Sequence, residues 1–176
     1  APPRALRRFW TMLAHYHAQT WNGSEIAGSL GINDVTARRY LDLLAGAYMV
    51  RLLPPWFENV GKRQRRAPKV YLRDSGILHS LLGIQDRTSL VAHPKCGSSW
   101  EGFAMEEVLR LLPRAEAYYW AVHSGPELDL LVIHRGRRIG VEFKRVDAPM
   151  LTPSMRIALK DLKLDELRVV YPGTTR

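Results

Sequence analysis

The sequence predicts an α/β protein made of two dissimilar halves. The first half has helical apolar spacing and most of the excess positive charge: residues 1–95 contain 14 Lys and Arg against 6 Asp and Glu, whereas residues 96–176 contain 12 against 11. The second half combines one long helical pattern with short, strongly apolar runs that are typical of strands. A basic half is expected to meet a polyanion, although a merely solvated basic surface is the alternative.

Composition excludes several classes of protein. Hydrophobic residues make up 46% of the 176 residues, which excludes a disordered tail. No apolar run reaches the roughly 18 residues that a membrane-spanning helix needs, and the start of the chain lacks the apolar segment of a secretory signal. The single cysteine, Cys96, cannot form an internal disulfide, which suits a reducing compartment. We therefore expect a cytoplasmic protein with no membrane partner.

Two helices joined by a tight turn are expected after a first helix over residues 4–18. Asn22 can cap the start of a short helix that Gly31 ends. Asn33 can cap a longer helix, from Asp34 to about Ala45. Two helices joined by a turn containing glycine are the signature of a helix-turn-helix.

Two strand-like segments follow, near residues 48–53 and 69–72, with a strongly basic loop between them that would form a wing. A winged helix-turn-helix is therefore predicted over residues 1–73. The alternative is a winged helix used for protein contact or packing. The second of the two helices and the loop offer side chains suited to base edges and phosphates of DNA: Asn33, Thr36, Arg38, Arg39, Lys62, Arg63, Arg65 and Arg66.

Four charged residues in the second half lie where a charge is costly. Glu101 heads the apolar row of a helix, and Asp129 lies within an apolar strand, so each needs a cation or a metal nearby. Glu142 and Lys144 are two apart on a further strand, which places both side chains on one face. The turn His134–Arg138 makes the two strands a hairpin, which brings Asp129 and Glu142 together.

Neighbouring carboxylates repel unless a divalent cation lies between them, and ligand sets made of oxygen favour Mg²⁺ or Mn²⁺ over Zn²⁺. The sequence therefore predicts a magnesium or manganese site at Asp129 and Glu142. The alternative is a set of inert ion pairs between Lys144 and the two strand acids.

These residues resemble the PD-(D/E)XK nuclease superfamily. The resemblance rests on Asp129, then Glu142-Phe143-Lys144, with Glu101 as the upstream helical acid. It implies a restriction-endonuclease-like α/β sandwich with a mixed sheet. It also implies that the three acids hold the metal, that Lys144 helps to position and deprotonate the attacking water, and that the substrate is a phosphodiester in DNA.

One departure from that family is the stretch Glu127–Asp129, which stands where the family has a Pro-Asp pair, although Pro126 is just before it. Nuclease-like domains also occur as modules without activity. A domain that holds nucleic acid or a partner protein without cleaving it is therefore the rival interpretation, and a pure assembly domain is the third.

The whole chain also resembles the C-terminal region of a family of bacterial and archaeal AAA-type ATPases, in which a winged helix and a nuclease-like domain follow the ATPase. The resemblance implies that an N-terminal ATPase module accompanies this region. The sequence has no Gly-x-x-x-x-Gly-Lys-Ser/Thr loop, so this chain itself is not expected to bind a nucleotide. The matching stretches are Arg39–Leu44, Arg51–Trp56, Lys69–Gly76, Tyr119–Trp120 and Glu127–Asp129.

The predicted organisation is a winged helix over residues 1–73, a connector over 74–97 and the nuclease-like domain over 98–176. The connector is expected to be helical from Asp74 to Ile84 and less ordered after that. The predicted elements of the last domain are a helix over 98–112, strands near 117–123, 128–134 and 138–145, a helix over 154–163 and a strand over 167–171.

Overall fold

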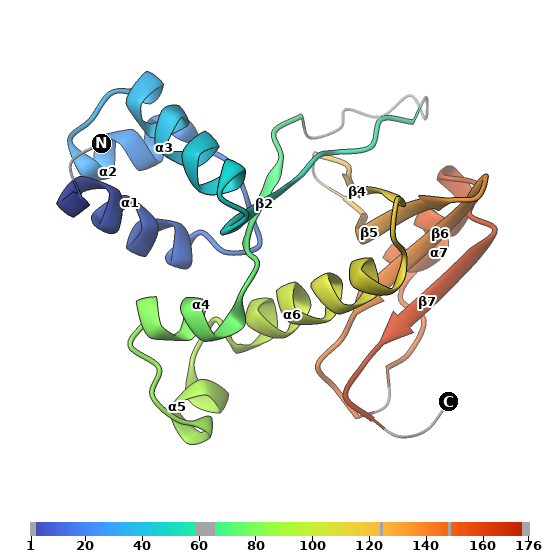
Figure 1. Cartoon of the computed structure of the whole chain (residues 1–176). Helices are drawn as coiled ribbons and strands as arrows, with labels where there is room; N and C mark the ends of the chain where they lie inside the picture. The colour runs from blue at the N-terminus through green and yellow to red at the C-terminus, as the bar shows by residue number, and fades with distance from the viewer. Residues whose placement is uncertain (1–2, 59–65, 124, 148, 174–176) are drawn as a thin grey trace. The chain divides into compact units, whose positions relative to one another are not determined.

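A computed structural model of the chain describes residues 3–58, 66–123, 125–147 and 149–173 (Figure 1). It is a mixed α/β structure in which the described residues form seven α-helices and two β-sheets. The chain divides into two compact units, residues 1–52 with 68–103 and residues 53–67 with 104–176. The prediction divided the chain at residues 73 and 97. In the structure, residues 53–67 belong to the second unit and residues 98–103 belong to the first.

The first unit begins with three helices and a small sheet of strand order β1-β3-β2, in which β1 and β3 are antiparallel. Further helices follow the sheet. The elements are α1 (Pro3–His15), β1 (Gln19–Thr20), α2 (Gly23–Leu30), α3 (Asp34–Gly46), β2 (Val50–Leu53), β3 (Lys69–Leu72), α4 (Ser75–Leu81), α5 (Arg87–Ala92) and the start of α6 (Cys96–Leu111).

The predicted ends of α2 and α3 are confirmed. The side-chain oxygen of Asn22 accepts from the N–H of Glu25 at 3.4 Å, and Gly31 ends α2 with a φ of 66°, which glycine adopts without strain. The side-chain oxygen of Asn33 accepts from the N–H of Thr36 at 2.8 Å. Local capping chemistry therefore sets the boundaries of both helices.

Two local predictions for the first unit were wrong or incomplete. Residues 85–97 were expected to be less ordered, but α5 lies within them, and α6 begins at Cys96. A reciprocal cap made by Asp86 and Ser89 starts α5. The two-residue strand β1 was not predicted, because so short a segment has no periodic pattern to detect.

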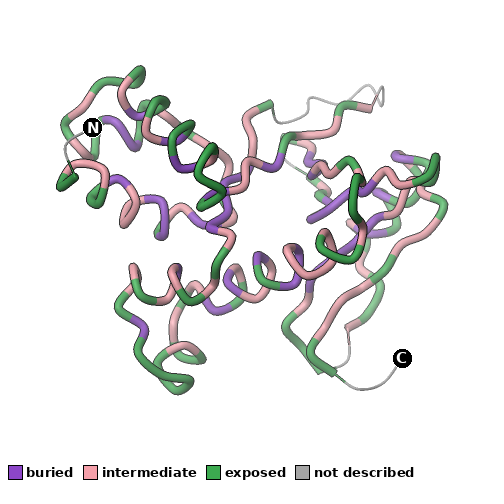
Figure 2. Tube along the Cα trace, in the orientation of Figure 1, coloured by how far each residue is buried: buried purple, intermediate pink, exposed green. Residues whose placement is uncertain are grey.

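One hydrophobic core holds this unit together. Side chains from four helices and a strand are fully buried in it, including Phe9 of α1, Ile26 of α2, Leu41 of α3, Val70 of β3 and Leu78 of α4. Figure 2 shows these buried stretches along the inner sides of the helices. Each such apolar side chain contributes roughly 1.5–3 kcal/mol on burial, so the core fixes the helices to the small sheet.

A buried histidine also ties parts of the first unit together. Nδ1 of His17 accepts from the N–H of Leu72 at 3.1 Å, which leaves Nε2 to donate to the carbonyl of Ser98 at 3.1 Å. Gly102 lies against this ring: a Cβ there would be 2.5 Å from Nε2 of His17. The start of α6 is thereby held to the loop after α1 and to β3.

The second unit is built on a four-stranded sheet of order β4-β5-β6-β7. The pairs β4–β5 and β5–β6 are antiparallel and β6–β7 is parallel, so the predicted mixed sheet is confirmed. Helix α7 packs Ala158 on Leu128 and Leu131 of β5. The elements are β4 (Glu116–Ala121), β5 (Glu127–His134), β6 (Arg137–Phe143), α7 (Pro153–Asp161) and β7 (Glu166–Val170).

Strands β5 and β6 are joined by the predicted hairpin. Arg135 and Gly136 form its two-residue loop with φ values of 51° and 78°, which match the right-handed twist of the strands. The ladder then runs from the pair His134–Arg137 to the pair Leu130–Val141. The register brings the next residues of the two strands, Asp129 and Glu142, opposite each other.

An earlier segment of the chain also belongs to the second unit. The N–H of Trp56 donates to the carbonyl of Tyr119 at 2.7 Å, and the N–H of Tyr119 donates to the carbonyl of Pro54 at 2.9 Å. Glu58 accepts from Arg138 at 2.7 Å. Backbone and side chain therefore both attach this segment to the sheet.

Candidate functional site

Asp129 and Glu142 face each other where the β5–β6 ladder ends. The N–H of Phe143 donates to Oδ2 of Asp129 at 3.0 Å, and the N–H of Asp129 donates to Oε1 of Glu142 at 3.4 Å. Carboxylate groups thus take the place of the backbone acceptors that would continue the ladder. Both side chains are held by the opposite strand.

The two carboxylates are buried, with Asp129 7% and Glu142 3% exposed. The pKa of Glu142 is raised from 4.5 to about 7, first by burial and then by the neighbouring Asp129 charge, and Lys144 opposes both effects. When both carboxyl groups are ionised, their negative charge therefore exceeds the positive charge that Lys144 supplies.

Lys144 supplies the positive charge of this cluster. Its Nζ lies 2.8 Å from Oε2 of Glu142, and its side chain is 36% exposed, so part of it reaches solvent. The N–H of Lys144 donates to the carbonyl of Val170 at 2.9 Å, which fixes its backbone beside β7. The structure thus brings Asp129, Glu142 and Lys144 together, as the sequence predicted.

Glu101 lies in the first unit, within α6. The hydroxyl group of Tyr71 donates to Oε1 of Glu101 at 2.5 Å, and Nζ of Lys69 lies 3.8 Å from the same oxygen. Tyr71 is fully buried and Lys69 nearly so, hence this carboxylate already has a hydroxyl donor and a cation. Within the described parts of the chain, no group of three or more His, Cys, Asp and Glu side chains is arranged to hold a metal ion.

The strand pair nevertheless fits a divalent cation by its chemistry. Oδ1 of Asp129 accepts no hydrogen bond from any residue that the structure describes, so it is available as a ligand. Glu142 is buried beside a like charge, and a bound cation would relieve that repulsion. Carboxylate oxygens are the ligands that Mg²⁺ and Mn²⁺ prefer.

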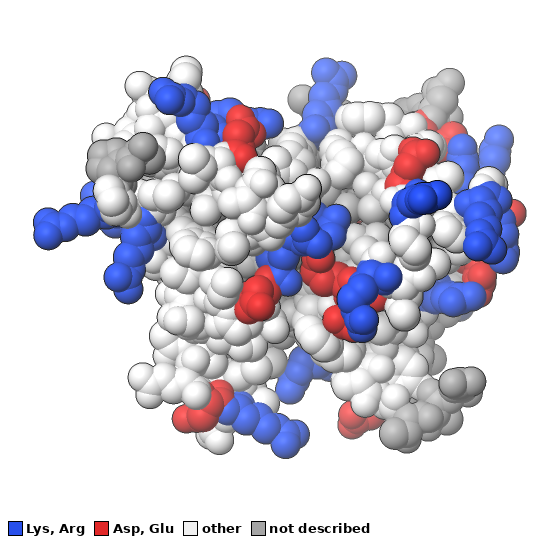
Figure 3. All heavy atoms as spheres, in the orientation of Figure 1, with Lys and Arg blue, Asp and Glu red and all other residues white. Residues whose placement is uncertain are grey.

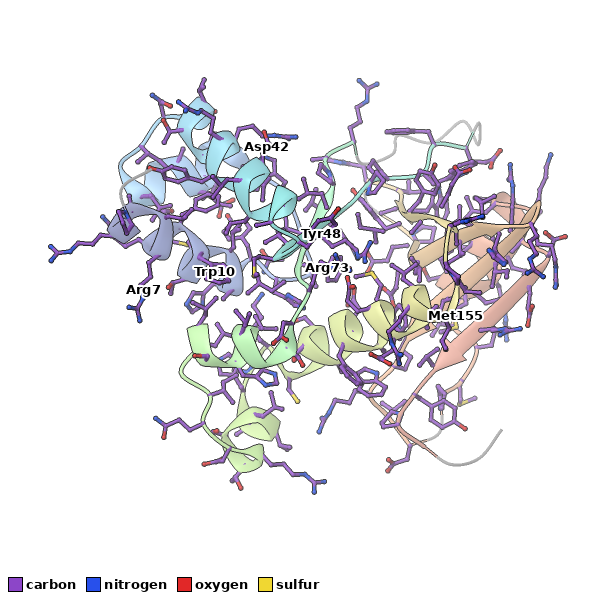
Figure 4. All side chains as sticks on the ribbon, viewed as in Figure 1. Arg7, Trp10, Asp42, Tyr48, Arg73 and Met155 are labelled. Atoms are coloured by element: carbon purple, nitrogen blue, oxygen red, sulfur yellow. The ribbon has the colours of Figure 1, made fainter. Side chains whose placement is uncertain are left out.

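The predicted DNA-binding residues of α3 have local partners. Asn33 caps the helix through Thr36, and Nε of Arg38 lies 2.9 Å from Oδ1 of Asp42, one turn further on. Arg39 is exposed on the same helix. Figure 4 marks Asp42 on this helix. Because Arg38 is paired with Asp42, Arg39 is the more available of these two basic side chains.

Of the four basic residues predicted for the wing, Arg66 is described and is exposed. The other three lie outside the described residues: Lys62, Arg63 and Arg65. Sequence reasoning did not identify a basic groove formed by α1 and α2, although the close spacing of Arg4, Arg7 and Arg8 was the available signal.

Fold and site together define a mixed α/β protein of two units, with a buried pair of carboxylates beside a lysine on a mixed sheet. The chain belongs to the family described as "Domain of unknown function (DUF8612)", whose model matches residues 1–88. The model of a second family, "Domain of unknown function (DUF4143)", matches residues 96–176. Domains of this second family are commonly found with AAA ATPases.

Two curated relatives are each 54% identical to the chain over 175 residues. They are "Uncharacterized protein Mb2031c" of Mycobacterium bovis and "Uncharacterized protein Rv2008c" of Mycobacterium tuberculosis. The match covers 99% of this chain but 40% of each relative, so the chain spans about two fifths of their length. No solved structure matches the chain. None of the helices in the described ranges is long and apolar enough to cross a membrane.

Proposed function

We propose that the second unit holds Mg²⁺ or Mn²⁺ between Asp129 and Glu142 and hydrolyses phosphodiester bonds in DNA. The observation that carries this proposal is the pair of buried carboxylates beside Lys144 at the end of the β5–β6 ladder. When bound, the metal polarises the phosphate and lowers the pKa of the attacking water. The mixed sheet, with α7 packed on β5, supports the restriction-endonuclease-like fold that this chemistry implies.

Each residue of the cluster has a distinct part in the proposal. The Phe143 N–H orients Asp129 and leaves its Oδ1 for the cation. Glu142 binds the cation through its ionised form, which the raised pKa restricts to neutral and higher pH. Lys144, held by Glu142 and partly exposed, stabilises the negative charge that develops on the phosphate oxygens.

The first unit is proposed to be the DNA-binding part. The element order α1-β1-α2-α3-β2-β3 and the sheet order β1-β3-β2 support a winged helix-turn-helix in which α3 is the recognition helix. Exposed Arg39 on α3 and Arg66 before β3 would contact phosphate. The DUF4143 match supports the further proposal that an AAA-type ATPase module accompanies this region in longer proteins.

A module that binds nucleic acid without cleaving it is the second proposal. The observation that favours it is the position of Glu101, whose carboxylate accepts from Tyr71 in the first unit, so the strand pair supplies only two acidic ligands. A phosphodiesterase site with two acids and a lysine depends more heavily on substrate oxygens to complete the metal's coordination.

Cleavage of supercoiled plasmid across a Mg²⁺ and Mn²⁺ series, with EDTA as the control, separates the two proposals. We expect Glu142→Gln to lose both metal binding and cleavage. Lys144→Ala should keep most of the metal affinity and lose cleavage by at least 10- to 100-fold, because its charge acts on the reacting phosphate. The matched controls are Glu107→Gln on α6 and Lys160→Ala on α7, which should cleave like the wild type.

Three results would contradict the nuclease proposal. If the wild type binds the metal but does not nick the plasmid, the second proposal, a module that binds without cleaving, would be favoured. Nicking that survives both Glu142→Gln and Lys144→Ala would come from a contaminating enzyme. Absence of any metal binding at neutral pH would remove the proposed site itself.

A further inference from the structure

The first unit contains a groove of about 590 Å³ that is lined only by residues of α1 and α2. Three arginines and a histidine of α1 line it, Arg4, Arg7, Arg8 and His15, together with the apolar side chains of Met12 and Leu30. It is formed by other helices than α3 and does not involve the carboxylate cluster. We call it the α1–α2 groove.

The charge of the α1–α2 groove is uncompensated. Arg4, Arg7 and Arg8 are exposed, no carboxylate lines the groove, and none of the three guanidinium groups makes an ion pair or hydrogen bond with a described residue. Figure 4 shows the Arg7 side chain extending away from α1. In Figure 3, blue atoms project from the side of this face that carries α1, without red atoms beside them. Like charges gathered in this way attract an anion.

The hydroxyl groups that line the groove do not serve as free donors. Thr11 donates to the carbonyl of Arg7 at 3.1 Å, and Ser29 donates to the carbonyl of Glu25 at 2.9 Å. The guanidinium groups and the imidazole are therefore the groups that would contact a ligand. Arginine presents several N–H donors in a planar fork that fits phosphate oxygens.

The length of the row indicates an extended ligand. Arg4, Arg8 and His15 follow one side of α1 at helical spacing, and eleven residues of helix rise about 16 Å. That length is too great for one phosphate group and suits a row of them. No Phe, Tyr or Trp side chain is among the described residues that line the groove, so contact is expected to fall mainly on the backbone of the ligand.

We propose that the α1–α2 groove binds the phosphate backbone of a nucleic acid strand, independently of sequence. This surface is additional to the contacts proposed for α3 and the wing, and it gives the first unit a second site of attachment to nucleic acid. A nucleic acid is favoured over an acidic protein segment because the groove offers a row of guanidinium donors. It offers only two apolar side chains against which the apolar side chains of a protein segment could pack.

The test is fluorescence anisotropy of a labelled DNA duplex with the 176-residue chain, between about 50 and 200 mM salt. Arg4→Gln, Arg7→Gln and Arg8→Gln combined should weaken binding roughly tenfold or more at the lower salt concentration. The slope of log K against log salt should become less negative by about 2.7, since each lost phosphate contact removes about 0.9. The triple Arg→Lys variant should retain most of the affinity, because it keeps the charge. Circular dichroism checks that each variant folds.

The matched control changes the same number of charges elsewhere: Arg87→Gln, Arg110→Gln and Arg156→Gln are at exposed positions outside the groove. It should bind like the wild type. Arg39→Gln tests the α3 contact separately. The proposal is overturned if the groove variant keeps the wild-type affinity and salt slope, whatever Arg39→Gln does. It is also overturned if the wild type does not bind at low salt, or if polyglutamate competes as well as unlabelled DNA, which would indicate an acidic protein ligand.

Discussion

Nζ of Lys144 lies 2.8 Å from Oε2 of Glu142, yet this contact does not offset the cost of burying that carboxyl group. The pKa of Glu142 is raised from its ordinary 4.5 to about 7, first by burial and then by Asp129. Between these values the folded protein binds more protons than the unfolded chain. The ionised form of Glu142 is therefore unfavourable in the folded protein unless a cation besides Lys144 is present.

The first prediction concerns the pH dependence that follows from Glu142. Its contribution to stability is greatest below about pH 4.5 and is lost as pH rises through about 7, because ionisation is then forced on a buried group. Glu142→Gln should remove this dependence and raise the stability of the metal-free protein at pH 8. Urea unfolding at pH 5 and pH 8 measures the change in the free energy of unfolding, with Glu107→Gln as the control. Equal pH profiles for Glu142→Gln and wild type would contradict it.

The second prediction separates Glu101 from the metal site. Tyr71→Phe removes the hydroxyl group that donates to Glu101 and leaves the ring in the core. It should lower the free energy of unfolding by about 1–3 kcal/mol, the cost of leaving a charged acceptor without its donor. Manganese affinity, measured by calorimetry, should be unchanged in Tyr71→Phe and in Glu101→Gln. A large loss of affinity in Glu101→Gln alone would make Glu101 a ligand after all.

The third prediction concerns two glycines of α6. An alanine at Gly102 would place its Cβ 2.5 Å from Nε2 of His17, a ring that two hydrogen bonds hold in place. Gly102→Ala should therefore destabilise the protein by about 1–3 kcal/mol. At Gly97 a Cβ would meet nothing within 4 Å, so Gly97→Ala should be neutral or stabilise by up to about 1 kcal/mol. Thermal unfolding of the two variants measures the difference. Equal effects of Gly102→Ala and Gly97→Ala would contradict the close packing of Gly102 against His17.

The fourth prediction concerns His17 in acid. Burial lowers its pKa from 6.5 to about 4, so the neutral ring stabilises the fold above about pH 6.5, and this contribution is lost as pH falls toward 4. The interval corresponds to roughly 3 kcal/mol. His17→Gln should be less stable at pH 7 and lose less stability between pH 6.5 and 4. His123→Gln, at an exposed position, is the control and should follow the wild type.

Features set by neighbouring residues could be predicted from the sequence. The caps at Asn22 and Asn33 depend on an N–H three residues away, and the Arg135-Gly136 turn follows from the short spacing between two apolar strands. Because a hairpin fixes register, the meeting of Asp129 with Glu142 was predictable too. The same local chemistry at Asp86 and Ser89 was present and was overlooked.

Features that depend on distant residues could not be predicted in the same way. Glu101 meets Tyr71, which is 30 residues earlier in the chain, and no spacing rule connects them. Its place at the head of an apolar row indicated that it faces inward, but not which donor it would find there. The α1–α2 groove likewise depends on Leu30 lying against α1, which the basic residues of α1 alone do not indicate.

The attachment of Pro54 and Trp56 to Tyr119 has a consequence for synthesis on the ribosome. This segment emerges more than sixty residues before the strand β4 that receives it. The first unit, in turn, is incomplete until Ser98 and Gly102 are available to His17. Neither unit can therefore finish folding as a contiguous nascent domain, and a truncation between residues 88 and 96, in the gap between the two family matches, would leave both halves without partners they need.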